Sequence, residues 1–326
     1  MARISASTGG WSCGSVIAPI VAGAALAFLT TAANAADDVG DAKLGDIAGW
    51  LVENQNAVLG VLTIIATFIL WRFHAVRAHG LDHGGRDVTP IPPILWVFAA
   101  GTTLFAYQLG GAAAVELGFA TDTVHDRAMQ TLLSGIAGTI VGGGLLWFAA
   151  REAKDAGLIP KWGDWPIGVG LFLVLYPIVS IVGLMGLWTV RGLNTVPQDR
   201  IAHDTLQLIA QHQGDSWVWV LSGVVVVLVP IVEELVYRVF LQSAFLRVFR
   251  SRWGAVLLTS VIFAGMHWTV LPDGGKYAIA QIFALSVALG AAYERTGKLG
   301  VPIAMHASFN AFNLLVTFLV DPMVQG

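Results

Sequence analysis

Long apolar stretches alternate with short polar connections along most of the chain. Each stretch has about the length that an α-helix needs to cross a membrane, roughly 20 residues. The stretches are continuous, whereas the strands of a membrane β-barrel alternate between polar and apolar residues. We therefore predict an all-α, polytopic helical membrane protein. The predicted membrane-crossing stretches are 56–73, 93–117, 129–150, 166–190, 217–246, 254–271, 278–293 and 299–320.

The amino-terminal segment has the features of an export signal. Arg3 precedes an apolar run from Val16 to Leu29, and Ala33-Asn-Ala35 has the small-x-small pattern of a signal peptidase site. We predict that residues 1–35 are a signal peptide or signal anchor. An uncleaved first transmembrane helix fits the same pattern.

The rest of the chain divides into parts of different character. Residues 36–55 are polar and acidic, and we expect them to be exposed. Residues 56–190 should form the N-terminal transmembrane helices. Polar residues within apolar stretches concentrate in residues 217–320, which we predict to be the functional core. We expect about seven transmembrane helices in the mature protein.

The distribution of Lys and Arg predicts an orientation, because these residues favour cytoplasmic connections. Every second connection is rich in them, and we place these connections in the cytoplasm: Arg72, Arg77, Arg86, Arg151, Lys154, Lys161, Arg247, Arg250, Arg252, Arg295 and Lys298. The other connections carry fewer: Lys43, Arg127, Arg191, Arg200 and Lys276. The C-terminus should then lie outside the cytoplasm, and the signal-like start favours a bacterial inner (plasma) membrane.

Composition supports the membrane class and limits the possible partners. The chain is 56% hydrophobic and 12% charged, about half the charged fraction of a soluble domain. Its net charge of −3 gives no reason to expect a nucleic acid partner. The one cysteine, Cys13, excludes a disulfide within the chain and a cysteine-ligated metal site. We expect a lipid bilayer and a peptide or membrane-protein substrate as partners.

Three charged residues interrupt the apolar stretch 217–246: Glu233, Glu234 and Arg238. A charge at membrane depth costs roughly 2.5 to 3.5 kcal/mol on insertion scales, so such residues are rare and usually functional. Pro230 lies just before them and removes a backbone donor. We expect it to open the helix locally and to admit water beside Glu233.

Two later stretches carry polar residues at compatible depths. One contains His267, and the other contains His306, Asn310 and Asn313. At a rise of about 1.5 Å per residue, four groups can meet at mid-membrane or in its cytoplasmic half: Glu233, His267, His306 and Asn310. His306 and both asparagines share one helix face, so spacing does not decide which asparagine acts.

This set of side chains suits hydrolysis of an amide by water. A carboxylate beside a neutral imidazole can take a proton from water, while a second histidine and an asparagine can hold a developing oxyanion. Gly-x-Ser-x-Gly is absent from the apolar segments, which argues against a rhomboid-like serine enzyme. His-Glu-x-x-His is absent too, which argues against a zincin or site-2-type metalloprotease.

Three motifs in this region resemble those of the CAAX prenyl protease and bacteriocin-processing (Abi, CPBP) family. They are Glu-Glu-x-x-x-Arg at 233–238, Phe-x-x-x-His at 263–267 and His-x-x-x-Asn at 306–310. Their order and their placement on separate stretches also match. The resemblance covers about residues 217–320 and implies a CAAX-protease-like catalytic core.

The resemblance implies an intramembrane glutamic endopeptidase and assigns roles by position. Glu233 would be the base that activates water, helped by His267. His306 and Asn310 would form the oxyanion site. Glu234, Arg238 and Asn313 would be supporting residues, and Glu234 and Arg238 form an i,i+4 pair that can neutralise itself. Val239 stands where many members have glycine.

Other interpretations fit the same residues. Glu233, His267 and His306 could instead ligate zinc with an open position for water, although we expect no cofactor. A non-catalytic membrane scaffold or bacteriocin-immunity protein could use the same fold. A transporter is also possible, although the buried charges lie in one half of the chain only.

Overall fold

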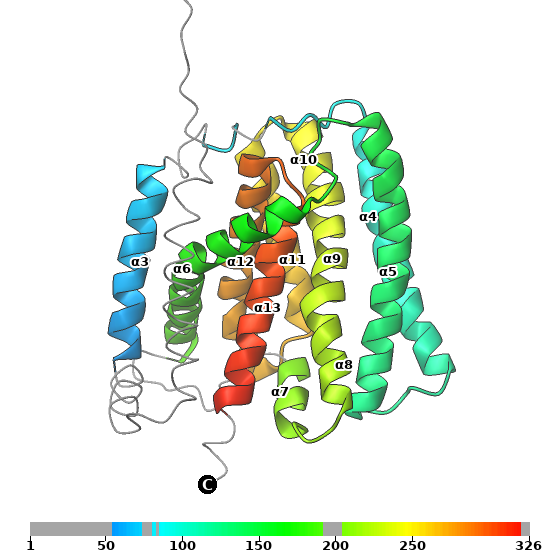
Figure 1. Ribbon diagram of the computed structural model, residues 1–326, viewed down its shortest axis with the longest axis vertical. Coiled ribbons are helices and arrows are strands. Elements are labelled where there is room, and N and C mark those ends of the chain that lie inside the picture. The colour runs from blue at the N-terminus through cyan, green and yellow to red at the C-terminus, as the bar shows by residue number, and fades with distance from the viewer. Residues whose placement is uncertain (1–53, 74–79, 83–84, 192–203, 321–326) are drawn as a thin grey trace, which may run out of the picture. The chain divides into compact units, whose positions relative to one another are not determined.

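The computed structural model is shown in Figure 1. The predicted export signal, residues 1–35, lies outside the residues that the structure describes. Residues 36–53 of the acidic segment lie outside them as well. The chain forms two compact units, Met1–Val58 and Leu59–Gly326, and the architecture below concerns the second. The described residues are 54–73, 80–82, 85–191 and 204–320.

Within these residues every regular element is a helix, so the predicted all-α class is confirmed. Large apolar side chains on these helices remain uncovered by protein, for example Ile94, Phe105 and Ile140, as expected of surfaces that face lipid. The α-helices are α3 (Gln55–Arg72), α4 (Pro93–Glu116), α5 (Val124–Glu152), α6 (Trp165–Arg191), α7 (Asp204–Gln211), α8 (Trp217–Gly223), α9 (Val229–Glu234), α10 (Gln242–Phe249), α11 (Arg252–Met266), α12 (Ile279–Thr296) and α13 (Gly300–Val320).

Six helical runs are long and apolar enough to cross a membrane, which confirms a polytopic helical membrane protein. They are Pro93–Glu116, Val124–Glu152, Trp162–Val190, Trp217–Phe249, Gly275–Thr296 and Gly300–Phe318. A shorter apolar helix, Asn56–Arg72, corresponds to the predicted stretch 56–73.

The predicted stretch 254–271 is longer than the helix that forms there. Helix α11 has 15 residues and ends at Met266, so it spans about 22 Å of a hydrocarbon core that is about 30 Å thick. Short 3₁₀ turns follow at His267–Thr269 and Asp273–Ala278. Pro272 lies between these turns and lacks a backbone donor, which prevents the helix from continuing. His267 therefore lies at a helix end.

The run Trp217–Phe249 is the central element, and it contacts α4, α5, α11 and α13 (Figure 1). It is one helical run with two wider, π-helical segments, Val224–Leu228 and Leu235–Leu241. The helix is thus widened on both sides of Pro230, where we expected a local opening, and it is not broken. π-Helical segments inside α-helices occur frequently at functional sites.

Glycines of α5 form a smooth face against this run. A Cβ atom at Gly135 would lie 3.0 Å from Leu228, and one at Gly138 would lie 3.0 Å from Val232. Gly142 faces Leu235 on the same side. Small residues let membrane helices approach closely. The approach fixes the position of Val232, the neighbour of Glu233.

A group of buried charges links the connection before α4 to the rest of the helix bundle. Glu294 of α12 has no exposed side-chain surface and pairs with both Arg86 and Arg252. Arg86 also donates to Ser243 Oγ at 2.7 Å and to the carbonyl oxygen of Ala156 at 2.9 Å. The sequence pattern identified both arginines as connection residues and did not reveal this network.

We predict that Gly138→Leu lowers the free energy of unfolding by about 1 to 3 kcal/mol, because it forces Val232 out of position. Gly143→Leu on the same helix is the matched control. No neighbouring atom lies within 4 Å of a Cβ at Gly143, so this change should stay within about 0.5 kcal/mol of the wild type. Unfolding of the purified protein in detergent measures both. Equal losses of stability in the two variants would contradict the close packing proposed for the glycines of α5.

Candidate active site

Glu233 and Glu234 are adjacent but have different surroundings. The carboxylate of Glu234 has no exposed surface, whereas the side chain of Glu233 is 23% exposed. Glu233 also lies at the middle of the run Trp217–Phe249. The run therefore presents one accessible and one sealed carboxylate at mid-membrane.

Arg238 neutralises the sealed carboxylate. Its Nε donates to Glu234 Oε2 at 3.0 Å, and its Nη2 donates to Ser286 Oγ on α12 at 3.0 Å. The guanidinium lies 5.3 Å from the centre of the Phe263 ring and is fully buried. The i,i+4 pair expected from the sequence is present. Sequence reasoning missed Ser286, because an isolated serine in an apolar helix carries no signal of its partner.

His306 lies between the two carboxylates. Its Nδ1 is 2.9 Å from Glu234 Oε1, and its Nε2 is 3.5 Å from Glu233 Oε2. Because an ionised carboxylate only accepts hydrogen bonds, Nδ1 carries a hydrogen and donates it to Glu234. This bond orients the ring and directs Nε2 toward Glu233.

His267 faces the same carboxylate from the 3₁₀ turn that follows α11. Its Nδ1 is 2.8 Å from the backbone oxygen of Phe263, which can only accept, so Nδ1 is the donor. In the neutral ring, Nε2 then carries the lone pair. Nε2 lies 3.9 Å from Glu233 Oε1, and the His267 side chain is 18% exposed.

Asn310 contacts the central run one turn away from His306 on α13. Its Nδ2 donates to the carbonyl oxygen of Val225 at 3.0 Å. In the π-helical segment, Val229 N bonds Val224 O, so the next donor in the pattern would be residue 230, which is Pro230 and has no N–H. Asn310 supplies the missing donor and keeps a second N–H available.

Asn313, the other candidate on α13, shows no comparable contact with the run. The structure records its backbone oxygen accepting from Thr317 Oγ1 at 2.9 Å. Among the two asparagines that spacing left open, Asn310 is the one that contacts the helix of Glu233.

The zinc alternative requires three ligands that converge on one point. Glu233, His267 and His306 are ligand types that zinc accepts. Across the part of the chain that the structure describes, however, no group of three or more His, Cys, Asp or Glu side chains is arranged to hold a metal ion. The Nε2 atoms of His267 and His306 nevertheless lie 3.9 and 3.5 Å from the carboxylate oxygens of Glu233, so the choice between a metal-free and a zinc-dependent reaction stays a prediction.

Comparison with known proteins identifies the segment that contains these groups. Residues 215–312 match the family model described as type II CAAX prenyl endopeptidase, Rce1-like. No curated protein and no solved structure matches the chain. The matched segment includes all three motifs, from Glu233 to Asn310. The resemblance to the CAAX prenyl protease family that the motifs indicated is therefore confirmed over residues 215–312 of this integral membrane protein.

Proposed function

We propose that the protein is an intramembrane endopeptidase of the glutamic type. The observation that carries the proposal is the gap of 3.9 Å between Glu233 Oε1 and His267 Nε2. This distance is too long for a hydrogen bond and suits a bridging water molecule. Both atoms accept hydrogen bonds, so a water in the gap donates one hydrogen to each and turns its oxygen lone pairs toward a substrate.

The reaction then needs one proton acceptor and no protein nucleophile. Glu233 takes a proton from the water as the water oxygen attacks the carbonyl carbon of the peptide bond. His267 accepts the second hydrogen bond and orients the water. When the carbon–nitrogen bond breaks, Glu233 returns the proton to the leaving amine.

His306 and Asn310 are proposed to stabilise the oxyanion formed by this attack. Asn310 offers its second Nδ2 hydrogen, and His306 offers Nε2 when that nitrogen is protonated. A protonated His306 also balances the local charge, because two positive groups, His306 and Arg238, then face the two carboxylates Glu233 and Glu234. Charge balance matters here because the membrane interior disfavours any unpaired ion.

Glu234 and Arg238 are proposed as positioning residues. Neither has exposed side-chain surface, so neither can reach a substrate in this arrangement. Glu234 holds the ring of His306 through Nδ1, and Arg238 compensates the charge of Glu234. For Asn313 we keep only a supporting role in helix packing.

The proposed substrate is a peptide, a leader sequence or a segment of a membrane protein that reaches the bilayer. The matched family is described by its prenyl substrates, but the signal-like start favours a bacterial inner membrane, where prenylated proteins of that kind are not expected. We place the C-terminus outside the cytoplasm, in agreement with the Lys and Arg distribution. A non-catalytic scaffold or immunity protein is the alternative.

We predict that Glu233→Gln abolishes cleavage, with a loss of at least about 100-fold, because the amide cannot take the proton from water. The measurement compares peptides released in cells that carry the wild type or the variant. Glu152→Gln, at the exposed end of α5, is the control with the same change of charge and should retain cleavage. Thermal unfolding shows whether both variants fold. A cellular phenotype that survives Glu233→Gln and His267→Ala would instead support the scaffold.

We predict that Arg238→Met destabilises the protein by about 3 to 5 kcal/mol, because it leaves the charge of Glu234 buried and unpaired. The double variant Glu234→Gln/Arg238→Met removes both charges and should recover most of this loss. Unfolding of the three proteins in detergent forms the test. A double variant as unstable as Arg238→Met would show that the pair is not the source of the effect.

We predict that metal chelators leave cleavage intact, since Glu233 activates water without a metal in the proposed reaction. Purified enzyme is treated with EDTA and 1,10-phenanthroline, and release of the peptides identified above is measured. Loss of cleavage with recovery on added zinc would overturn the metal-free mechanism. An unchanged rate would favour it over the zinc alternative.

A further inference from the structure

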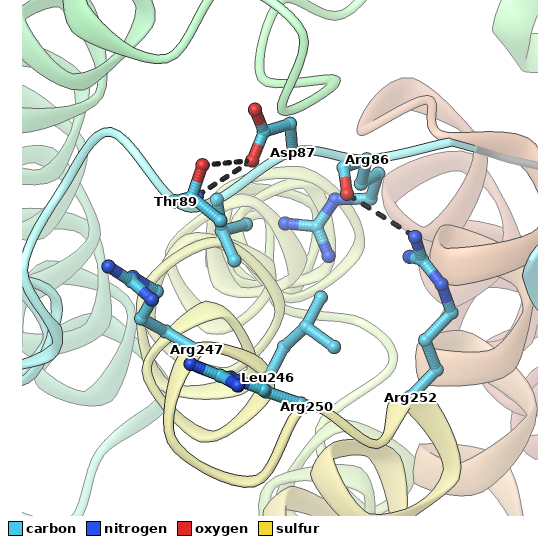
Figure 2. Close-up of a pocket in the computed structure, with 8 residues that line it drawn as sticks. Arg86, Asp87, Thr89, Leu246, Arg247, Arg250 and Arg252 are labelled. Atoms are coloured by element: carbon cyan, nitrogen blue, oxygen red, sulfur yellow. Dashed lines mark hydrogen bonds between the residues drawn. The ribbon is translucent and has the colours of Figure 1, made fainter.

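A cavity of about 300 Å³ lies beside the last turn of α10 at the end of the central run, and none of the proposed catalytic residues lines it. Figure 2 shows the residues of this lining. The lining includes four arginines, Arg86, Arg247, Arg250 and Arg252, together with Asp87 and Thr89. Figure 2 shows Arg247 and Arg250 across the cavity from the connection that carries Asp87 and Thr89. Four guanidinium groups around one cavity make it a candidate anion site.

The four arginines differ in how far their charges are compensated. Arg86 and Arg252 pair with the buried carboxylate of Glu294. Across the described residues, no ion pair is formed by Arg247 or Arg250. The Nε of Arg247 is also buried and has no hydrogen-bond partner among those residues. A buried donor without a partner is costly, and an anion in the cavity would satisfy it.

Asp87 supplies the carboxylate in the cavity lining, and Thr89 already donates hydrogen bonds to it. Its Oδ1 accepts from Thr89 Oγ1 at 2.6 Å and from Thr89 N at 2.9 Å. These bonds, with a smaller contribution from Arg247, lower the pKa of Asp87, so it remains ionised at neutral pH. Three carboxylates lie near the four arginines: those of Asp87, Glu294 and Asp82, which pairs with Arg252 Nε. Their three negative charges do not balance four positive charges. The cavity keeps an excess of positive charge.

Arg250 occupies a backbone conformation that ordinarily favours glycine. Its φ is 52°, and it is the one non-glycine residue with positive φ among the described residues. It follows the last turn of α10, a position that glycine commonly fills. A left-handed conformation costs a non-glycine residue roughly 1 to 2 kcal/mol, and strain of this kind clusters at binding sites.

The cavity lies at the membrane surface. The run Trp217–Phe249 ends beside Arg250, and the spanning run Pro93–Glu116 begins just after Thr89. Apolar side chains next to the arginines are exposed: Val248 is 56% and Phe249 is 53% exposed. Val248 and Phe249 lie outside the cavity lining, whose own apolar residues are Val88 and Leu246. A ligand in the cavity therefore meets guanidinium groups together with apolar side chains.

We propose that this cavity binds the phosphate group of an anionic phospholipid. Guanidinium groups bind phosphate oxygens through paired hydrogen bonds, and basic pockets at the cytoplasmic ends of membrane helices suit anionic headgroups. Free phosphate offers the same chemistry to Arg247 and Arg250. The exposed Val248 and Phe249 favour the lipid, because acyl chains can pack on them. The proposal does not depend on the protease activity.

The test uses the full-length protein in detergent and measures bound lipid by native mass spectrometry. Phosphatidylglycerol, phosphatidylcholine with the same acyl chains and inorganic phosphate are added separately. We expect phosphatidylglycerol to bind in preference to the other two. Arg247→Gln/Arg250→Gln should weaken its binding roughly thirtyfold, as the loss of two surface arginines implies. Arg151→Gln is the matched control, since Arg151 lies outside the cavity on the same predicted membrane side and contacts Trp147.

Arg250→Gly separates binding from folding. Glycine relieves the left-handed backbone, so this variant should be at least as stable as the wild type while it binds phosphatidylglycerol several-fold more weakly. Unchanged lipid binding in Arg250→Gly and in the double variant would overturn the proposal. Equal binding of phosphatidylcholine would overturn it too, and so would a preference for inorganic phosphate, which would identify the ligand as a free anion.

Discussion

The buried ion pair between Glu234 and Arg238 is the interaction on which the geometry of the site depends. A carboxylate with no exposed surface at mid-membrane is tolerable only when its charge is compensated and its oxygens are hydrogen-bonded. Arg238 and His306 meet these requirements, one on each oxygen. The bond to Glu234 also orients His306, whose other nitrogen then faces Glu233. Stability and orientation of the site thus come from the same contact.

The backbone of the central run contributes a second constraint. Pro230 removes one donor, the helix widens on both sides of it, and Asn310 bonds the carbonyl oxygen of Val225. This bond holds α13, which also carries His306, against the helix that carries Glu233. On the opposite side, the glycine face of α5 lets Val232 approach closely. The position of Glu233 is therefore fixed by packing on two sides.

Local patterns predicted most of the membrane-crossing helices, because apolar length is a property of each stretch alone. The motifs also indicated which residues belong together, and helix rise placed Glu233 and His267 at compatible depths. Spacing on α13 did not separate Asn310 from Asn313, and only the motif resemblance pointed to Asn310; its contact with the carbonyl oxygen of Val225 depends on tertiary structure. Two further features also depended on tertiary contacts and could not be predicted. Ser286 has a role only because Arg238 reaches it. Arg86 carries the same sequence signal as any connection arginine, yet it is buried against Glu294.

A polar seam between the central run and α12 connects the catalytic centre with the arginine cavity. Ser286, Gly290 and Glu294 follow one another at intervals of four residues and share one face of α12. Arg238 bonds Ser286, and Gln242, one turn further along the run, bonds the carbonyl oxygen of Gly290 and the carboxylate of Glu294. A shift of the run by one residue along α12 would leave all these buried groups without partners at once. Because each unpaired buried group is costly, the seam fixes the register of the run, and with it the depth at which Glu233 lies in the membrane.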